Sequence, residues 1–103
     1  MTTATLDRKY AMTRMLGAYL LPSNDGKTLW RINSYHEDGS AERSDGTPIV
    51  GKFWATSKRP MPTEADIQRC DTEVDFVWYD DAWVAWSFMH KTRAEAIAEA
   101  LRA

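Results

Sequence analysis

The sequence predicts an α+β fold: an antiparallel, meander-like sheet of about four or five strands, a C-terminal helix packed on one face, and a short helix near residues 63–70. Three observations support this prediction. Segments rich in tryptophan, isoleucine and valine alternate with clusters of turn-forming residues. Helix-capping signals precede only two segments. A chain of 103 residues is long enough for a single domain, 1–103, with one modest core.

The N-terminal part of the chain is the least certain. Residues 1–9 are rich in threonine and charged side chains, and we expect them to form a flexible arm. In residues 10–21, apolar side chains fit both helical spacing and strand alternation, so both interpretations stay open. We favour a strand over residues 14–21, because Gly17 disfavours a helix by about 1 kcal/mol relative to alanine.

A turn and two strands are predicted next. Residues 22–26 combine proline, serine, asparagine, aspartate and glycine, which favour turns. A strand follows from Thr28 to His36. Alternation places Trp30, Ile32 and Ser34 on one face, and Leu29, Arg31, Asn33 and Tyr35 on the other. Residues 37–48 are almost wholly polar, and we expect an exposed, mobile loop there.

The next strand should run from Ile49 to Ser57, with Gly51 marking a bulge. Pro60 and Pro62 then break the chain. Thr63 is a suitable N-cap, and acidic residues follow it in the first turn. These signals predict the short helix near residues 63–70.

Residues 73–89 predict a β-hairpin, because two strand-like runs flank Asp80 and Asp81. A tight turn there would place Trp78 opposite Trp83. Both faces of such a hairpin are largely apolar, which predicts a central position in the sheet.

The last element is predicted to be a helix. Thr92 and Glu95 fit a capping box, in which the threonine side chain caps the helix and the glutamate side chain reaches back to the Thr92 backbone N–H. A narrow apolar stripe of small residues would let this helix lie close to the sheet. The stripe consists of Ala94, Ile97, Ala98 and Leu101.

Composition limits the functional classes. The net charge of −2 argues against binding nucleic acid by bulk charge. The single cysteine, Cys70, excludes an internal disulfide and a cysteine-rich zinc site. Neither a secretory signal nor an apolar stretch long enough to span a membrane is found in the sequence. We therefore expect a cytoplasmic protein that does not contact membranes.

The sequence contains no motif typical of a catalytic or cofactor-binding site. Phosphate-binding loops, hydrolase elbows and metal-binding helices are all missing from it. The two histidines, His36 and His90, have no spacing that indicates a metal site. We therefore predict no enzyme activity, no cofactor and no metal.

Tryptophan content leads to the main functional hypothesis. Five tryptophans, with several phenylalanines and tyrosines, exceed what one small helix can cover, so some aromatic rings should remain exposed. Residues 71–81 are also rich in acidic side chains. We predict a protein-binding module, accessory, inhibitory or regulatory, that acts on a larger, basic partner. Its predicted contact residues are Trp78, Tyr79, Asp80, Asp81 and Trp83.

Two further interactions are compatible with the sequence. Nucleic acid could bind to the sheet face through aromatic and basic residues. The basic residues are Lys52, Lys58, Arg59, Lys91 and Arg93. The apolar hairpin could also pair with its copy in a homodimer. Small size without catalytic motifs is typical of viral and mobile-element accessory proteins.

Overall fold

The computed structural model describes residues 13–15, 17–70, 72 and 75–102. The predicted arm, residues 1–9, lies outside the described residues. Within the described residues, no helix is both long and apolar enough to cross a membrane.

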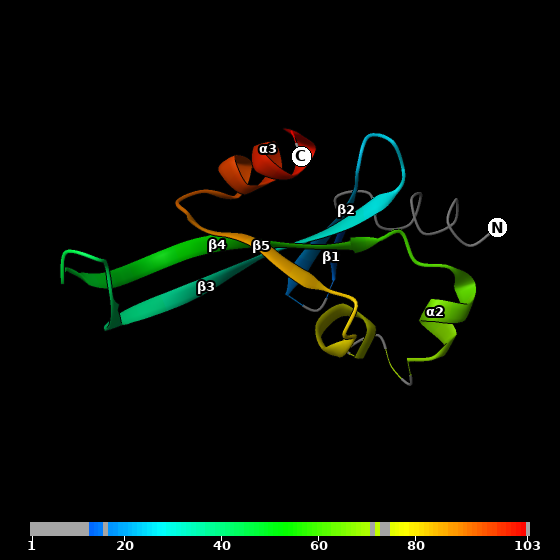
Figure 1. Ribbon diagram of the computed structural model, residues 1–103, viewed down its shortest axis with the longest axis horizontal. Helices are drawn as coiled ribbons and strands as arrows, with labels where there is room; N and C mark the ends of the chain where they lie inside the picture. Colours follow the sequence, from blue (N-terminus) through cyan, green and yellow to red (C-terminus); the bar gives the residue numbers. More distant parts are fainter. Residues whose placement is uncertain (1–12, 16, 71, 73–74, 103) are drawn as a thin grey trace.

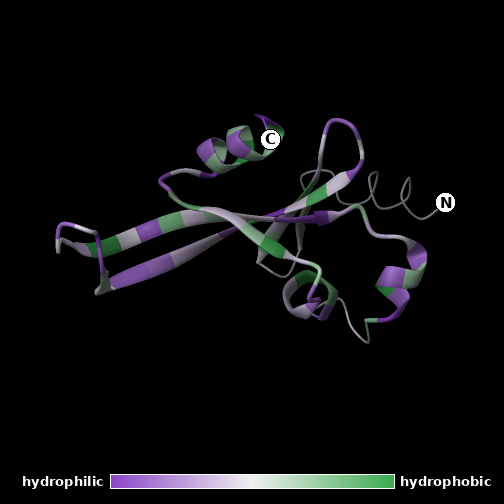
Figure 2. Ribbon diagram, viewed as in Figure 1, coloured by the Kyte–Doolittle hydropathy of each residue, from purple (hydrophilic) through white to green (hydrophobic). Residues whose placement is uncertain are grey.

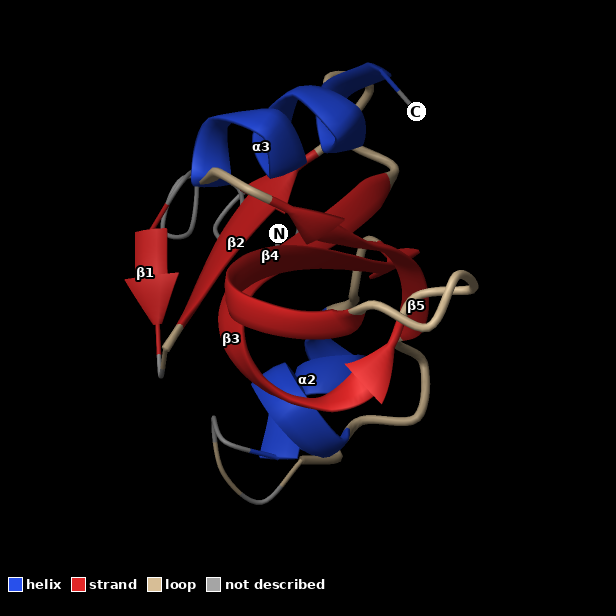
Figure 3. Cartoon of the chain, turned by 90° about the vertical axis from the view of Figure 1, so that its left-hand side faces the viewer, coloured by secondary structure: helices blue, strands red, loops and turns tan. Residues whose placement is uncertain are grey.

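Five antiparallel strands form one sheet, in which each strand pairs with the next along the chain (Figure 1). They are β1 (Thr13–Met15), β2 (Ala18–Pro22), β3 (Thr28–Glu42), β4 (Pro48–Pro60) and β5 (Val84–His90). Helix α3 (Arg93–Arg102) covers one face of the sheet, and α2 (Glu64–Gln68) lies on the opposite side with the π-helical turn η1 (Asp75–Tyr79) (Figures 1 and 3). The predicted α+β meander is confirmed.

The first two strands correct the prediction of a single strand over residues 14–21. Strands β1 and β2 pair with each other, and Met15 lies opposite Ala18. Gly17 lies in the turn between them with a φ of 85°. That backbone conformation strains any residue with a Cβ atom, so the glycine that argued against a helix in fact permits a chain reversal.

The turn and strand predicted at residues 22–36 are confirmed. Gly26 has a φ of 70°, and the Thr28 amide donates to the Ser23 hydroxyl at 3.0 Å. Alternation along β3 then divides the core. Leu29 packs on the η1 side of the sheet, whereas Trp30 packs against α3.

Most of the predicted loop 37–48 is corrected: residues 37–42 and 48 extend two strands, and only residues 43–47 form a turn between them. Strand β3 continues to Glu42, and β4 begins at Pro48. The two strands form a ribbon that projects beyond the body of the molecule (Figure 1). Most side chains of this segment are exposed, so polar residues are suited to both faces of the ribbon.

The irregularity in this ribbon lies on β3. Gly51 pairs in register with Glu37, although its φ is 124°. The register shifts between Asp38 and Glu42, where β3 carries more residues than its partner. The bulge predicted at Gly51 is therefore displaced to the opposite strand.

The hairpin predicted over residues 73–89 does not form. Asp75–Tyr79 is a turn of π-helix, and only Val84–His90 is a strand. Strand β5 is an edge strand that pairs with β4, not a central one. The coiled turn carries Phe76 and Val77 beneath the sheet, where both are buried, and this packing outweighs the local preference for an extended chain.

Helix α3 is capped by the Thr92 side chain as predicted, but the Glu95 carboxylate accepts from the Thr92 hydroxyl at 3.3 Å rather than from its backbone N–H. The Glu95 amide donates to the Thr92 hydroxyl at 3.1 Å. A different face of the helix is also buried. The side chains that pack on the sheet are Ala96, Ile97 and Ala100. Of the predicted stripe only Ile97 is in this contact, while Ala94, Ala98 and Leu101 are exposed. Because alanines occur on several sides of this helix, its sequence does not determine which side faces the sheet. Packing against the sheet determines that orientation.

The sheet separates two apolar clusters. The cluster on the η1 side contains Ala18, Leu20, Leu29, Phe76 and Val77. The cluster on the α3 side contains Leu21, Trp30, Ile32, Ala96 and Ala100. Hydrophilic and hydrophobic bands alternate along the projecting ribbon, which has no such layer over it (Figure 2).

Candidate functional site

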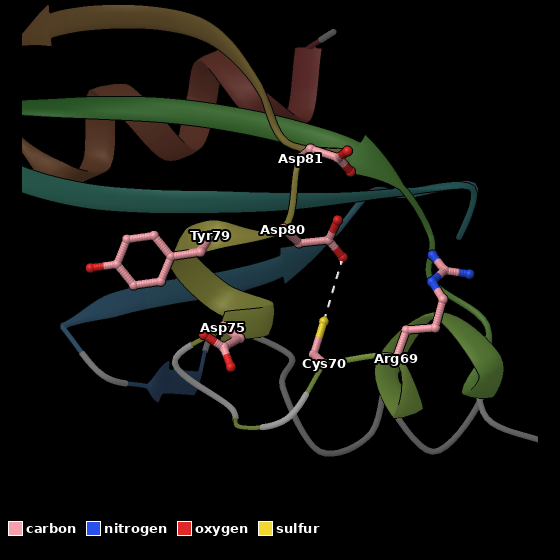
Figure 4. Close-up of a pocket in the computed structure, with 6 residues that line it drawn as sticks. All are labelled: Arg69, Cys70, Asp75, Tyr79, Asp80 and Asp81. Atoms are coloured by element: carbon pink, nitrogen blue, oxygen red, sulfur yellow. Dashed lines mark hydrogen bonds between the residues drawn. The ribbon is translucent and has the colours of Figure 1, made fainter.

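A pocket of about 390 Å³ opens beside η1, between this turn and the end of α2 (Figure 4). It brings Tyr79, Asp80 and Asp81, which the sequence predicted as contact residues, next to side chains that the sequence did not connect with them. The residues that line it are Arg69, Cys70, Asp75, Tyr79, Asp80 and Asp81.

Asp80 lines this pocket and is fixed by a buried ion pair. Its Oδ2 lies 2.7 Å from Nη1 of Arg59, and the two side chains are only 9% and 3% exposed. The Ala82 amide donates to the other oxygen at 3.1 Å. Burial by itself raises the pKa of Asp80, but the hydrogen bonds from Arg59 and Ala82 outweigh it, so the pKa lies below its ordinary value. Asp80 is therefore a permanent anion near neutral pH.

The Cys70 thiol donates a hydrogen bond to Asp80. Its sulfur lies 3.8 Å from Asp80 Oδ2 (Figure 4). Burial, and then the negative charge of Asp80, raises the pKa of the Cys70 thiol. Because the thiolate is the reactive form, this environment suppresses the nucleophilicity of the cysteine.

The rim of the pocket combines an exposed aromatic ring with carboxylates that have no cation beside them. Tyr79 is 75% exposed, and its ring points away from Cys70, Asp80 and Arg69 (Figure 4). Arg69 is paired with Asp66 at 2.9 Å. Within the part of the chain that the structure describes, neither Asp75 nor Asp81 has a basic group within 4.0 Å. The rim therefore carries a surplus of negative charge.

The two predicted tryptophans lie apart from this rim and pack around Arg31. The guanidinium carbon of Arg31 lies 5.0 Å from the Trp78 ring centroid and 4.7 Å from that of Trp83. Trp83 Nε1 donates to the Phe76 carbonyl at 2.8 Å. Both indoles are half-buried, and their contacts support η1 beneath the sheet.

The basic residues predicted to contact nucleic acid are divided among several environments. Arg59 is buried with Asp80. Lys58, its neighbour on β4, projects to the α3 side, where its Nζ lies 3.7 Å from the Trp86 ring centroid. Lys52 and Arg93 line a second pocket, of about 230 Å³. Lys91 is exposed before α3.

Strand β5 exposes apolar side chains that the sequence assigned to a covered hairpin. Val84 is 57% exposed, Trp86 47% and Phe88 67%. Register shifts on both sides of Ser87 turn Phe88 away from the face that Trp86 occupies. The exposure follows from the edge position of β5, which the local pattern did not reveal.

The histidines form no metal cluster. His36 is exposed, and Nε2 of His90 lies 3.0 Å from the Ser87 hydroxyl. Among the described residues, no group of three or more His, Cys, Asp or Glu side chains could hold a metal ion.

Comparison with known proteins gives no relative: no family model, no curated protein and no solved structure matches the chain.

Proposed function

We propose that the protein is a small, non-catalytic binding module that docks a basic segment of a larger partner protein, as an accessory, inhibitory or regulatory factor. The observation that carries the proposal is the pocket lining, which combines exposed Tyr79 with the carboxylates Asp75 and Asp81, neither of which has a basic group within 4.0 Å among the described residues. Asp80, which also lines the pocket, is held in place by its ion pair with Arg59.

The chemistry of this rim suits an arginine or lysine side chain. A cation gains from contact with the face of an aromatic ring and from charge-assisted hydrogen bonds with carboxylates. Tyrosine is also enriched among the residues that dominate binding energy at protein interfaces. Complementary charge increases the rate of encounter and penalises acidic partners. The single free cysteine fits the cytoplasm as the place of this interaction.

The proposal is tested by titrating the isotope-labelled protein with an arginine-rich hexapeptide and following its amide signals by NMR. We expect saturable shifts at Tyr79 and Asp81 that weaken as the salt concentration rises. Tyr79→Ala and Asp81→Asn should each weaken the affinity at least about tenfold, a loss typical of an interface anchor. A glutamate-rich hexapeptide should leave these signals unchanged.

Glu42→Gln is the matched control for Asp81→Asn, because it removes one exposed negative charge from the projecting ribbon. Its affinity should equal that of the unchanged protein. Equal affinities for Asp81→Asn and Glu42→Gln would show that only net charge matters, and the pocket would then have no role.

Strand β5 favours a second interaction, self-association. It is the last strand of the sheet, and within the described residues no strand pairs with its outer edge. A second copy could pair there across a two-fold axis and cover Trp86 and Phe88.

Sedimentation across a range of concentrations tests this interaction. Phe88→Ser should shift the equilibrium to the monomer, whereas Val50→Ser, at an equally exposed position on β4, should not. A monomer at every concentration, for the unchanged protein, would contradict self-association.

A further inference from the structure

The second pocket lies on the α3 side of the sheet, and its walls come from three parts of the chain. Gly17 lies in the β1–β2 turn, and Arg93 is the first residue of α3. Strands β2, β3 and β4 supply the remaining residues that line the pocket, which are Tyr19, Ser34, Lys52 and Trp54.

The sheet register places these side chains next to one another. Ser34 pairs directly with Trp54, and Lys52 follows two residues away on the same face of β4. The rings of Tyr19 and Trp54 lie with their centroids 6.3 Å apart. Two neighbouring aromatic rings therefore form one wall of the pocket.

The two cations are held in position by these rings. Arg93 Nη1 donates to the Tyr19 hydroxyl at 2.6 Å, and its guanidinium carbon lies 4.7 Å from the ring centroid. Lys52 Nζ lies 5.2 Å from the Trp54 ring centroid. Cation–π contact restrains both side chains while most of their N–H donors stay available.

The charge of this pocket is opposite to that of the chain. The protein has a net charge of −2, yet none of the described residues that line the pocket is acidic. Within the described ranges, neither Lys52 nor Arg93 has a carboxylate within 4.0 Å. Two uncompensated cations in one concavity concentrate positive potential there, so an anion is the complementary ligand.

We propose that this pocket binds a nucleotide, with its phosphate held by Arg93, Lys52 and the Ser34 hydroxyl, and its base stacked against Trp54 and Tyr19. Guanidinium donors match the geometry of phosphate oxygens, and lysine adds a compact charge. Aromatic rings accept any base by stacking. The volume of about 230 Å³ is below the roughly 300–1,000 Å³ of sites that enclose a whole drug-sized ligand, so a bound nucleotide would be only partly enclosed and the rest of it would lie at the surface.

The site does not depend on the acidic pocket beside η1, so either proposal can fail alone. The test is an NMR titration of the full chain at fixed ionic strength with inorganic phosphate, adenosine monophosphate and single-stranded oligothymidylate. The Trp54 indole signal, assigned with Trp54→Phe, should shift on addition of the mononucleotide. Because the base adds stacking, the mononucleotide should bind about tenfold more tightly than inorganic phosphate.

Charge-removing variants locate the ligand. Lys52→Gln and Arg93→Gln should each weaken mononucleotide binding at least about tenfold, while Arg43→Gln, in the exposed turn of the ribbon, should leave it unchanged. All three should keep the thermal midpoint of the unchanged protein, which excludes loss of folding as the cause.

The third ligand identifies the source of the nucleotide. Tighter binding of the oligothymidylate than of the mononucleotide supports a nucleotide within a single strand, and the reverse order supports a free one. An unshifted Trp54 signal with every ligand would overturn the site. Equal affinities for inorganic phosphate and the mononucleotide, or binding that survives both Lys52→Gln and Arg93→Gln, would also overturn it.

Discussion

Two arginines and three aromatic rings form a continuous stack beneath the sheet. The Trp83 ring lies 4.7 Å from the Arg31 guanidinium carbon and 5.7 Å from that of Arg59. Trp78 contacts Arg31, and Phe76 contacts Arg59, at comparable distances. Trp78 and Trp83 therefore pack against the guanidinium groups of Arg31 and Arg59 beneath the sheet. This packing explains why they do not project from a hairpin.

The buried pair Arg59–Asp80 supports a prediction about stability. Asp80→Asn leaves the Arg59 guanidinium buried without a counter-charge, and we expect a loss of about 3 kcal/mol in the free energy of unfolding. The pKa of Asp80 is lowered in the folded protein, so its contribution is present above the pKa of the unfolded chain and is lost as pH falls through the folded pKa. Urea unfolding between about pH 2 and pH 7 should therefore show a flatter acid limb in Asp80→Asn.

The control is Glu99→Gln, which removes one member of the exposed pair Arg102–Glu99. Surface pairs of this kind contribute about 0.3–0.5 kcal/mol at most, so its stability should nearly equal that of the unchanged protein at every pH. Identical pH profiles for Asp80→Asn and the unchanged protein would contradict the role assigned to the buried pair.

At the scale of elements, the features that depend on near neighbours could be predicted from the sequence. Thr63 caps α2 through a reciprocal pair of hydrogen bonds with Asp66, and Thr92 caps α3. Such caps involve residues three positions apart, so the pattern alone reveals them. The alternating faces of β3 follow equally directly from the period of a strand.

Elements that depend on distant contacts could not be predicted. Asp75–Tyr79 has the composition of a strand, but it coils because Phe76 and Val77 fill the space below β2 and β3. The polar segment 37–42 extends β3 because Glu37, Asp38 and Glu42 pair with residues of β4 across the ribbon. In the acidic pocket, Tyr79, Asp80 and Asp81 were predictable as neighbours in sequence. The contacts of Asp80 with Arg59 and Cys70 were not, because they depend on how distant segments pack together.

The orientation of α3 supports a second prediction. Ala100 is fully buried against the sheet, whereas Ala98 is exposed. Ala100→Leu inserts extra volume into a packed interface and should reduce the free energy of unfolding by about 1–3 kcal/mol. Ala98→Leu has nearly the same helix propensity and no neighbour to displace, so it should change stability by less than about 0.5 kcal/mol.

Denaturant unfolding of these two variants distinguishes the observed face of α3 from the stripe that the sequence suggested. That stripe placed Ala98 inward and left Ala100 outside it. The reverse order of stabilities, with Ala98→Leu the less stable, would mean that the helix is rotated from the orientation described above.

At the scale of the molecule, a single sheet lies between the two apolar clusters, and neither cluster is thick. The chain measures 49 × 29 × 19 Å, so much of its length is a single layer with helices on part of each face (Figure 1). Small domains bury a limited share of their surface, and this shape limits it further. Both clusters are therefore expected to unfold together, since the strands between them are shared.

The last prediction concerns the two apolar clusters, which share the strands of the sheet but lie on opposite faces of it. Ile32→Val, on the α3 side, should reduce the free energy of unfolding by about 0.5–1.5 kcal/mol, and Val77→Ala, on the η1 side, by about 2 kcal/mol. Because the sheet lies between these side chains, their effects should add within about 0.5 kcal/mol in the double variant. Leu29→Val combined with Val77→Ala, within one cluster, should depart from additivity. A coupling as large across the sheet as within the cluster would show that the two cores behave as one packed body.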